Sequence, residues 1–172
     1  MPWKLLYVSL VRPHLEYASA VWSPYLKGDV SALEKVQERA TRIPTALRHL
    51  PYEERLKAWG LTTLEVRRAR GDLIQLYKLM NGSETIEWHT GPLLAPSGST
   101  RSSARNDLCL RREAFASKVQ NDHGHFVTVR HEFFLNRVVE HWNGLSNYEI
   151  HAPSLNSFKA RIDSSMAAAA TA

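Results

Sequence analysis

The sequence predicts a mainly α-helical protein with two helical parts joined by a loop. Three observations lead to this fold class. Apolar residues recur at the helical period in several separate stretches, and residues typical of helix caps mark the ends of most of them. A stretch rich in Gly, Pro and Ser interrupts the pattern near the middle. With 172 residues, 44% of them hydrophobic, the chain is long enough to bury a core.

The first apolar stretch, Trp3–Trp22, is predicted to be an amphipathic core helix. Pro13 should kink or split it near Arg12, because proline lacks an amide hydrogen and its ring clashes with the preceding turn. The stretch also imitates a signal peptide, but charged and polar residues interrupt it before the small-residue site at residues 18–20. The residues on its apolar side are Leu6, Leu10 and Tyr17.

The next two helices are predicted from their end signals. Ser31 and Glu34 fit a capping box, in which the hydroxyl and the carboxylate each satisfy a free backbone amide at a helix start. Pro44 ends that helix. A shorter helix, Tyr52–Trp59, follows, and Gly60 suits its left-handed end.

The longest predicted helix is Thr62–Met80. A second capping box, Thr62 with Glu65, begins it, and the Asn81-Gly82 pair ends it. Apolar residues gather on one face and basic residues on the other, so the helix should be amphipathic with a cationic back. The apolar face comprises Val66, Ala69, Leu73, Leu76, Tyr77 and Met80, and the cationic back comprises Arg67, Arg70 and Lys78.

The second half of the chain is predicted to hold a smaller module. Leu108–Leu110 and Phe126–Val129 are short enough to be strands and could pair as an antiparallel ribbon. One helix from about Glu132 to Trp142 and another that opens at Pro153 complete it. The predicted organisation is a basic helical bundle over residues 1–82, a linker over 83–107, a C-terminal module over 108–163 and an Ala-rich tail over 164–172 that frays.

Positive charge is concentrated in the first half of the chain. Residues 1–82 carry 13 Lys and Arg against 8 Asp and Glu, whereas residues 83–172 carry 9 of each. A polyanionic partner is therefore expected to bind the N-terminal bundle.

The single cysteine, Cys109, forms no internal disulfide and excludes a cysteine-rich zinc module. It favours a reducing, intracellular setting, with nucleus or cytoplasm left open. No apolar run reaches the roughly 20 residues of a membrane-spanning helix, so no membrane partner is expected.

The sequence carries no catalytic motif. No serine lies in a nucleophile elbow and no Gly-rich phosphate loop is present. His123 and His125 are spaced as zinc ligands can be, and Cys109 or Asp122 could in principle complete a site. No His pair stands at i,i+4 with a glutamate between, and short matches of this kind are often accidental, so no metal or other cofactor is expected. We interpret His131 and His141 as capping or lining a helix face.

Tryptophans can stack on unpaired bases or fill a core. Trp22, Trp59 and Trp142 each adjoin an apolar element, which predicts a core position for all three, while Trp88 lies in the linker.

Two blocks of the sequence carry recognisable strings. The first comprises Leu10–Ala18, Val21–Pro24, Leu33–Arg42, Arg48–Leu56, Gly60–Glu65, Arg67–Arg68, Arg70–Ile74 and Tyr77–Lys78, and the second comprises Phe133–Val139, Trp142–Asn143 and Ala152–Lys159. They resemble the segment just after the palm of reverse transcriptases from LINE-type (non-LTR, jockey-like) retrotransposons. The resemblance covers most of the chain except about residues 83–125. It implies the thumb of an RNA-directed DNA polymerase and the C-terminal extension that follows it.

The resemblance also implies nucleic-acid binding without catalysis. Polymerases of this kind hold two Mg²⁺ ions on paired aspartates in the palm, and this sequence contains no Asp-Asp pair, so no polymerase activity is expected from it alone. The thumb resembles a clamp whose cations contact the phosphates of a primer–template duplex without reading bases. That duplex is either an RNA or DNA duplex or an RNA–DNA hybrid. The candidate contacts are Arg39, Arg42, Arg67, Arg70 and Lys78.

Two other interpretations stay open. The basic side chains could form solvated helix faces with i,i+4 partners such as Glu38 for Arg42. The chain could also be an inactive remnant, as 5′-truncated copies of such elements are, or a helical interaction module bound by a palm domain or another protein. In that case the apolar residues Leu5, Leu6 and Val8 would be partly uncovered.

Overall fold

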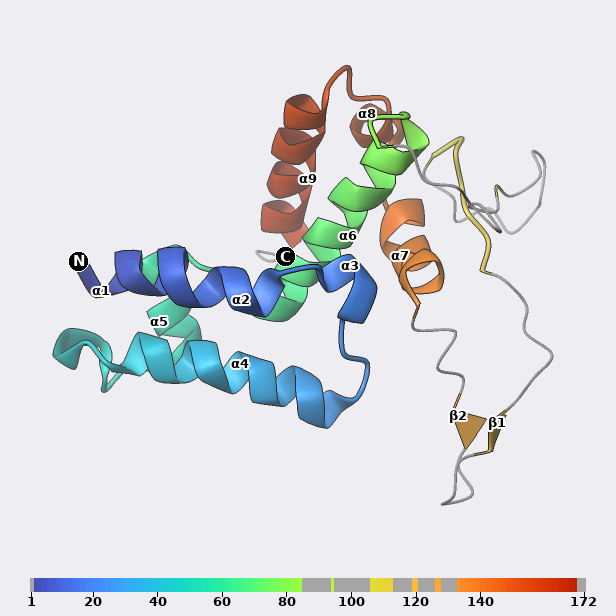
Figure 1. Ribbon diagram of the computed structural model, residues 1–172. Helices are drawn as coiled ribbons and strands as arrows, with labels where there is room; N and C mark the ends of the chain where they lie inside the picture. The colour runs from blue at the N-terminus through green and yellow to red at the C-terminus, as the bar shows by residue number, and fades with distance from the viewer. Residues whose placement is uncertain are drawn as a thin grey trace. The chain divides into compact units, whose positions relative to one another are not determined.

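The computed structural model is mainly helical (Figure 1), which confirms the predicted fold class. The structure describes residues 2–84, 94, 106–112, 119–120, 126–127 and 133–169. The elements are α1 (Pro2–Leu6), the π-helical turn η1 (Tyr7–Val11), α2 (Arg12–Glu16), α3 (Ser19–Trp22), α4 (Lys27–Arg42), the 3₁₀ turn η2 (Thr45–Leu47), α5 (Tyr52–Trp59), α6 (Leu64–Met80), β1 (Val119–Gln120), β2 (Phe126–Val127), α7 (Phe134–Asn143), α8 (Asn147–Ile150) and α9 (Leu155–Ala169).

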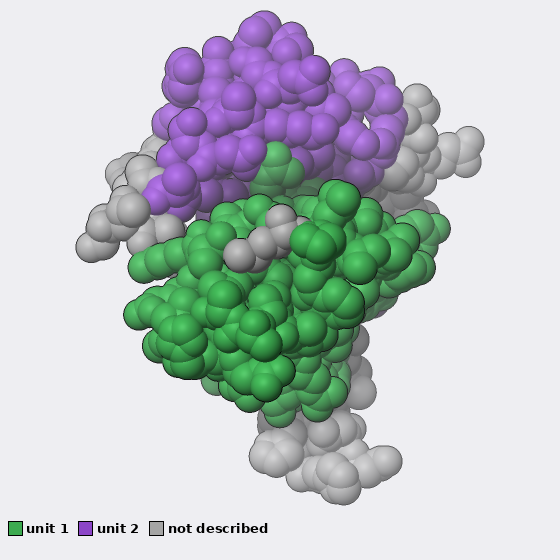
Figure 2. Space-filling model, turned by 90° about the vertical axis from the view of Figure 1, so that its left-hand side faces the viewer, with its two compact units in different colours: residues 1–71 green, residues 72–172 purple. Residues whose placement is uncertain are grey.

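The chain divides into two compact units, which Figure 2 colours separately. Unit 1 comprises residues 1–71 and unit 2 comprises residues 72–172. The division lies inside α6, whereas the sequence predicted a boundary after residue 82. The reason is that the C-terminal half of α6 buries Leu73, Leu76 and Tyr77 in the core of unit 2.

The N-terminal stretch is helical but divided differently from the prediction. The chain stays helical through Pro13, because the preceding turn is π-helical and the Arg12 N–H donates to the Tyr7 carbonyl five residues back. The predicted apolar face is wrong: Leu6, Leu10 and Tyr17 are exposed, and Tyr7 is the buried residue of this segment. Tyr7 packs with Leu47 and Trp59 in the core of unit 1.

The break in the N-terminal stretch occurs at Ala18. Its φ of +49° is the one positive φ of a non-glycine residue in the described chain. In this left-handed conformation the Cβ crowds the backbone, which costs an alanine about 1–2 kcal/mol. The Ala18 carbonyl accepts the Val21 N–H at 2.8 Å and starts α3. The break therefore turns α3 away from the line of α2 at the expense of local strain.

A buried polar network joins the helices of unit 1 through the Gln37 side chain, which is 0% exposed. Its Oε1 accepts the Tyr7 hydroxyl at 2.8 Å. Its Nε2 donates to the Tyr52 hydroxyl at 2.9 Å and to the Thr62 carbonyl at 3.1 Å. One side chain thus connects η1, α4, α5 and the segment that leads into α6.

Glu34 extends this network to the start of α6. Its Oε2 accepts the Leu64 N–H at 2.9 Å, and its Oε1 accepts the Tyr52 hydroxyl. Burial raises the pKa of the Tyr7 and Tyr52 hydroxyls well above the ordinary tyrosine value, and at Tyr52 the hydrogen bond to Glu34 adds to the shift. Both hydroxyls therefore remain protonated donors at neutral pH.

Glu34 is consequently not the capping-box residue that the sequence predicted. Helix α4 begins at Lys27, four residues before Ser31, with Leu26 at its N-cap and no side-chain cap. The Glu34 carboxylate instead accepts the Leu64 N–H at the start of another helix, where the helix dipole favours a negative charge. Helix α6 begins at Leu64, two residues after the predicted start, and its N-cap hydroxyl comes from Thr63, which accepts the Val66 N–H at 3.3 Å.

Other helix ends match the sequence. Helix α5 has the predicted bounds, and Gly60 closes it with a φ of +59°. Helix α6 ends at Met80 before Gly82, whose φ is +64°. Helix α9 follows Pro153 but continues into the predicted fraying tail as far as Ala169.

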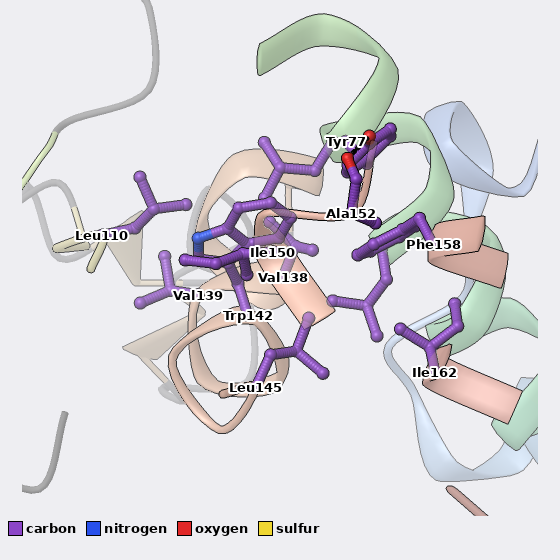
Figure 3. Packing of buried hydrophobic residues seen from close by; sticks show 12 residues of the cluster. Tyr77, Leu110, Val138, Val139, Trp142, Leu145, Ile150, Ala152, Phe158 and Ile162 are labelled. Atoms are coloured by element: carbon purple, nitrogen blue, oxygen red, sulfur yellow. Dashed lines mark hydrogen bonds between the residues drawn. The ribbon is translucent and has the colours of Figure 1, made fainter. Parts of the chain in front are cut away.

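Unit 2 packs helices α7–α9 and the end of α6 around one apolar cluster. Figure 3 shows Trp142 within it, with Leu110 and Val139 on one side and Phe158 on the other. The Tyr77 ring stacks on Phe158 with centroids 4.2 Å apart, and its hydroxyl donates to the Ala152 carbonyl at 2.6 Å. At its edge, Arg137 forms a two-point ion pair with the buried Asp72, with N–O distances of 2.7 and 2.9 Å.

The predicted ribbon has a different partner strand. Phe126–Val127 form β2, but they pair antiparallel with Val119–Gln120 and not with Leu108–Leu110. The reason is that helix α7 satisfies the backbone around Leu110: the Asn143 side chain accepts its N–H and donates to its carbonyl, both at 2.8 Å. Most of the predicted linker, residues 83–107, lies outside the described residues.

We predict that Ala18→Gly leaves the free energy of unfolding unchanged or raises it by up to about 1 kcal/mol, because glycine adopts a positive φ without strain. Ala32→Gly, in the exposed middle of α4, is the matched control and should cost about 0.5–1 kcal/mol. Urea unfolding followed by circular dichroism measures both. Equal destabilisation by the two substitutions would show that residues 12–22 form one continuous helix.

We predict that Gln37→Met destabilises unit 1 by about 2–3 kcal/mol. Methionine packs much as glutamine does, but its thioether leaves the buried partners of Gln37 without their hydrogen bonds. Gln75→Met, at a half-buried position on α6, should cost less than about 1 kcal/mol. The same urea titration applies. A Gln37→Met protein as stable as the wild type would mean that the network contributes little.

Candidate nucleic-acid interface

The exposed face of α4 carries three cations. Lys35, Arg39 and Arg42 are all exposed and follow one another at i, i+4 and i+7, which places them along one side of the helix. The opposite side is buried at Gln37 and Thr41. The polar network that fixes Gln37 inward therefore also fixes the cationic side outward. We call Lys35, Arg39 and Arg42 the α4 cationic face.

The dimensions of this face suit a phosphate backbone. At a rise of 1.5 Å per residue, Lys35 and Arg42 are separated by about 10.5 Å along the helix axis. Extended cationic side chains at that spacing can reach successive phosphates of one strand while making no contact with base edges. In the described chain no ion pair involves Lys35 or Arg39. Their charges are available to an external anion.

Arg42 differs from its two neighbours because it has an internal partner. Its Nη2 lies 3.2 Å from Glu38 Oε1, the i,i+4 pair expected from the sequence. Both side chains are substantially exposed, 59% for Arg42 and 38% for Glu38. Such exposed pairs contribute little to stability and are easily exchanged for another anion.

Arg67 does not join the α4 cationic face. Its guanidinium forms a two-point ion pair with Glu16, in which Nη2 lies 2.9 Å from Oε2 and Nε contacts Oε1. Arg12 lies 3.6 Å from the same carboxylate. A planar guanidinium held at two points by a carboxylate has its charge satisfied within unit 1, so Arg67 is a structural residue.

The remaining two candidates, Arg70 and Lys78, lie on α6. Arg70 is half-buried on α6. Lys78 belongs to unit 2, where its Nζ lies 2.7 Å from Glu84 Oε1. That contact, with a further hydrogen bond from Gln75, lowers the pKa of the Glu84 carboxyl. Of the five predicted residues, only Arg39 and Arg42 therefore belong to the α4 cationic face.

Lys35 is not among the candidate contacts predicted from the sequence. The signal that could have found it is its spacing to Arg39 and Arg42. Two further arginines that look equally exposed in the sequence are buried, Arg55 at 2% and Arg68 at 4% exposure. Only the tertiary packing separates these from the cations at the surface.

The tryptophan predictions have different outcomes. Trp59 and Trp142 are core residues, as predicted. The prediction for Trp22 is wrong: it is 41% exposed, because the break at Ala18 carries α3 out of the core, and its Nε1 donates to the Tyr17 carbonyl. Trp88 lies outside the described residues.

The histidine prediction can be followed only in part. His123, His125 and His131 lie outside the described residues, while His141 is exposed in the last turn of α7. Within the described ranges, no group of three or more His, Cys, Asp or Glu side chains could hold a metal ion. Over those same ranges, every helix is too short or too polar to cross a membrane.

Comparison with known proteins identifies no relative. No family model matches the chain, and no curated protein or solved structure matches it either.

Proposed function

We propose that unit 1 binds nucleic acid through phosphates, independently of base sequence, and that the chain corresponds to the thumb and C-terminal extension of a LINE-type reverse transcriptase. The partner is an RNA or DNA duplex or an RNA–DNA hybrid. The proposal includes no polymerase activity, because the sequence lacks the paired aspartates that hold the catalytic metal ions. It places the protein inside the cell, in keeping with its single cysteine.

The observation that carries the proposal is the α4 cationic face. Its three cations are exposed at regular spacing, on a rigid helix whose opposite side is buried. Cations held in this way bind a polyanion mainly by releasing its condensed counterions, which gives affinity without base specificity. The excess of 13 basic over 8 acidic residues in residues 1–82 strengthens the attraction at longer range.

For three phosphate contacts, we predict that the affinity for an RNA–DNA hybrid falls about 40-fold between 50 and 200 mM salt. Arg39→Gln should reduce the slope of log affinity against log salt by about 1, because one contact is lost. Fluorescence anisotropy with a labelled hybrid of arbitrary sequence measures both quantities.

Lys57→Gln is the matched control, since it removes one exposed positive charge from α5 and leaves the α4 cationic face intact. It should leave the slope unchanged. Affinity that is weak and independent of salt would contradict the proposed function. Equal effects of Arg39→Gln and Lys57→Gln would assign binding to net charge and not to this face.

A second candidate function is that of a helical protein-interaction module. The observation that favours it is the set of apolar side chains exposed along the N-terminal helices, where Tyr7 and Val8 pack inward but other apolar residues do not. Contiguous exposed apolar surface is typical of a site covered by a partner, such as a palm domain or another chain. The exposed residues are Leu5, Leu6, Leu10 and Val11.

If this second candidate is correct, the isolated protein should self-associate with rising concentration, and the pair Leu6→Ser and Leu10→Ser should reduce that association. Sedimentation velocity over a concentration series measures it. Leu26→Ser, at an exposed leucine outside the N-terminal helices, is the control and should have little effect. A wild-type protein that is a monodisperse, cooperatively melting monomer would contradict this candidate.

A further inference from the structure

Glu38 occupies an unusual position beside the α4 cationic face. Its Oε1 lies between two guanidinium groups, 3.2 Å from Arg42 Nη2 and 3.7 Å from Arg55 Nη2. One of these groups is exposed and the other is buried. A single carboxylate oxygen is thus placed where an anion would be attracted by two cations at once.

Arg55 is held in place without this carboxylate. Its Nε donates to Thr41 Oγ1 at 3.2 Å and its Nη1 donates to the Leu50 carbonyl at 2.6 Å, while the guanidinium lies 5.5 Å from the centre of the Tyr52 ring. The side chain is 98% buried, yet Nη2 has no hydrogen-bond partner within the described structure. Because 3.7 Å is too long for a hydrogen bond, Glu38 attracts this nitrogen but does not satisfy it.

These contacts define a position for an anion in which the buried cation is fixed and the bound carboxylate can be replaced. Arg55 supplies a buried, immobile positive charge and an unused donor. Arg42 supplies an exposed guanidinium that can turn toward solvent. Glu38 is partly exposed, so its carboxylate can turn toward solvent when another anion takes its place beside the buried Arg55.

We propose that Glu38 is an internal competitor that occupies the position of a nucleic-acid phosphate, and that a bound strand displaces it from Arg42. The inference rests on the proposed function and adds a regulatory element to the same face. Phosphate and carboxylate oxygens accept from guanidinium in the same two-point geometry, so one can replace the other. Binding then turns Glu38 toward solvent, and affinity is lower than the three cations alone would give.

The test is the affinity of Glu38→Gln for a labelled RNA–DNA hybrid. We expect binding about two- to fivefold tighter than wild type, because the strand no longer has to break one exposed ion pair and such pairs contribute a factor of about this size. Glu53→Gln is the matched control, because it removes an exposed carboxylate of unit 1 from α5. It should change affinity less than Glu38→Gln does.

The mechanism is tested by repeating Glu38→Gln in an Arg42→Gln background. If Glu38 acts by occupying Arg42, its replacement there should give no more than the Glu53→Gln effect. An equal gain with and without Arg42 would overturn the inference, as would equal gains from Glu38→Gln and Glu53→Gln in the wild-type background.

Two measurements keep the test decisive. Thermal melting shows whether Glu38→Gln is folded, and Glu38→Asp serves if it is not, since it keeps the charge but withdraws the carboxylate from Arg42 by one methylene. Its affinity should rise with net charge unchanged, and no rise would overturn the inference. If neither wild type nor any Glu38 variant binds the hybrid at 50 mM salt, the proposed function itself fails. Salt-dependent wild-type binding without a Glu38 effect overturns only the competitor role.

Discussion

The buried side chain of Gln37 is the constraint on which the arrangement of unit 1 depends. A primary amide that is 0% exposed must have its donors and acceptor satisfied, because an unmet buried polar group costs as much as several favourable contacts supply. The partners of Gln37 come from residues 30 positions before it and 25 after it. Few other arrangements of these helices would satisfy all of them together.

This constraint also determines which surface unit 1 presents. Once Gln37 and Thr41 face inward, helical geometry requires Lys35, Arg39 and Arg42 to face solvent. The cationic face is therefore a consequence of the same packing that makes the fold, and the helix fixes the backbone positions of its three residues. Cations on a preformed helix need no backbone ordering when they bind, which is why α4 is a better candidate for phosphate contact than a loop.

In unit 2, side-chain hydrogen bonds hold an irregular segment of the chain in place. Asn143 satisfies both backbone groups of Leu110, and the Trp142 Nε1 donates to the Leu108 carbonyl at 2.9 Å. Two neighbouring side chains of α7 thereby hold an irregular segment against a helical core. The Asp72–Arg137 ion pair connects α6 to α7 in the same unit.

The sequence by itself determined the features that depend on neighbouring residues: the bounds of Tyr52–Trp59, its left-handed end at Gly60, the exit of the next helix at Met80, and the helical spacing of Arg39 and Arg42. Caps, glycines and periodicity act over one or two turns, so they can be read without a fold. The tertiary structure alone decided that Glu34 caps a helix 30 residues away, that Glu16 neutralises Arg67 across 51 residues, and that Ala18 breaks the first helix. Charge satisfaction and burial depend on which side chains meet in space, and no local pattern records that.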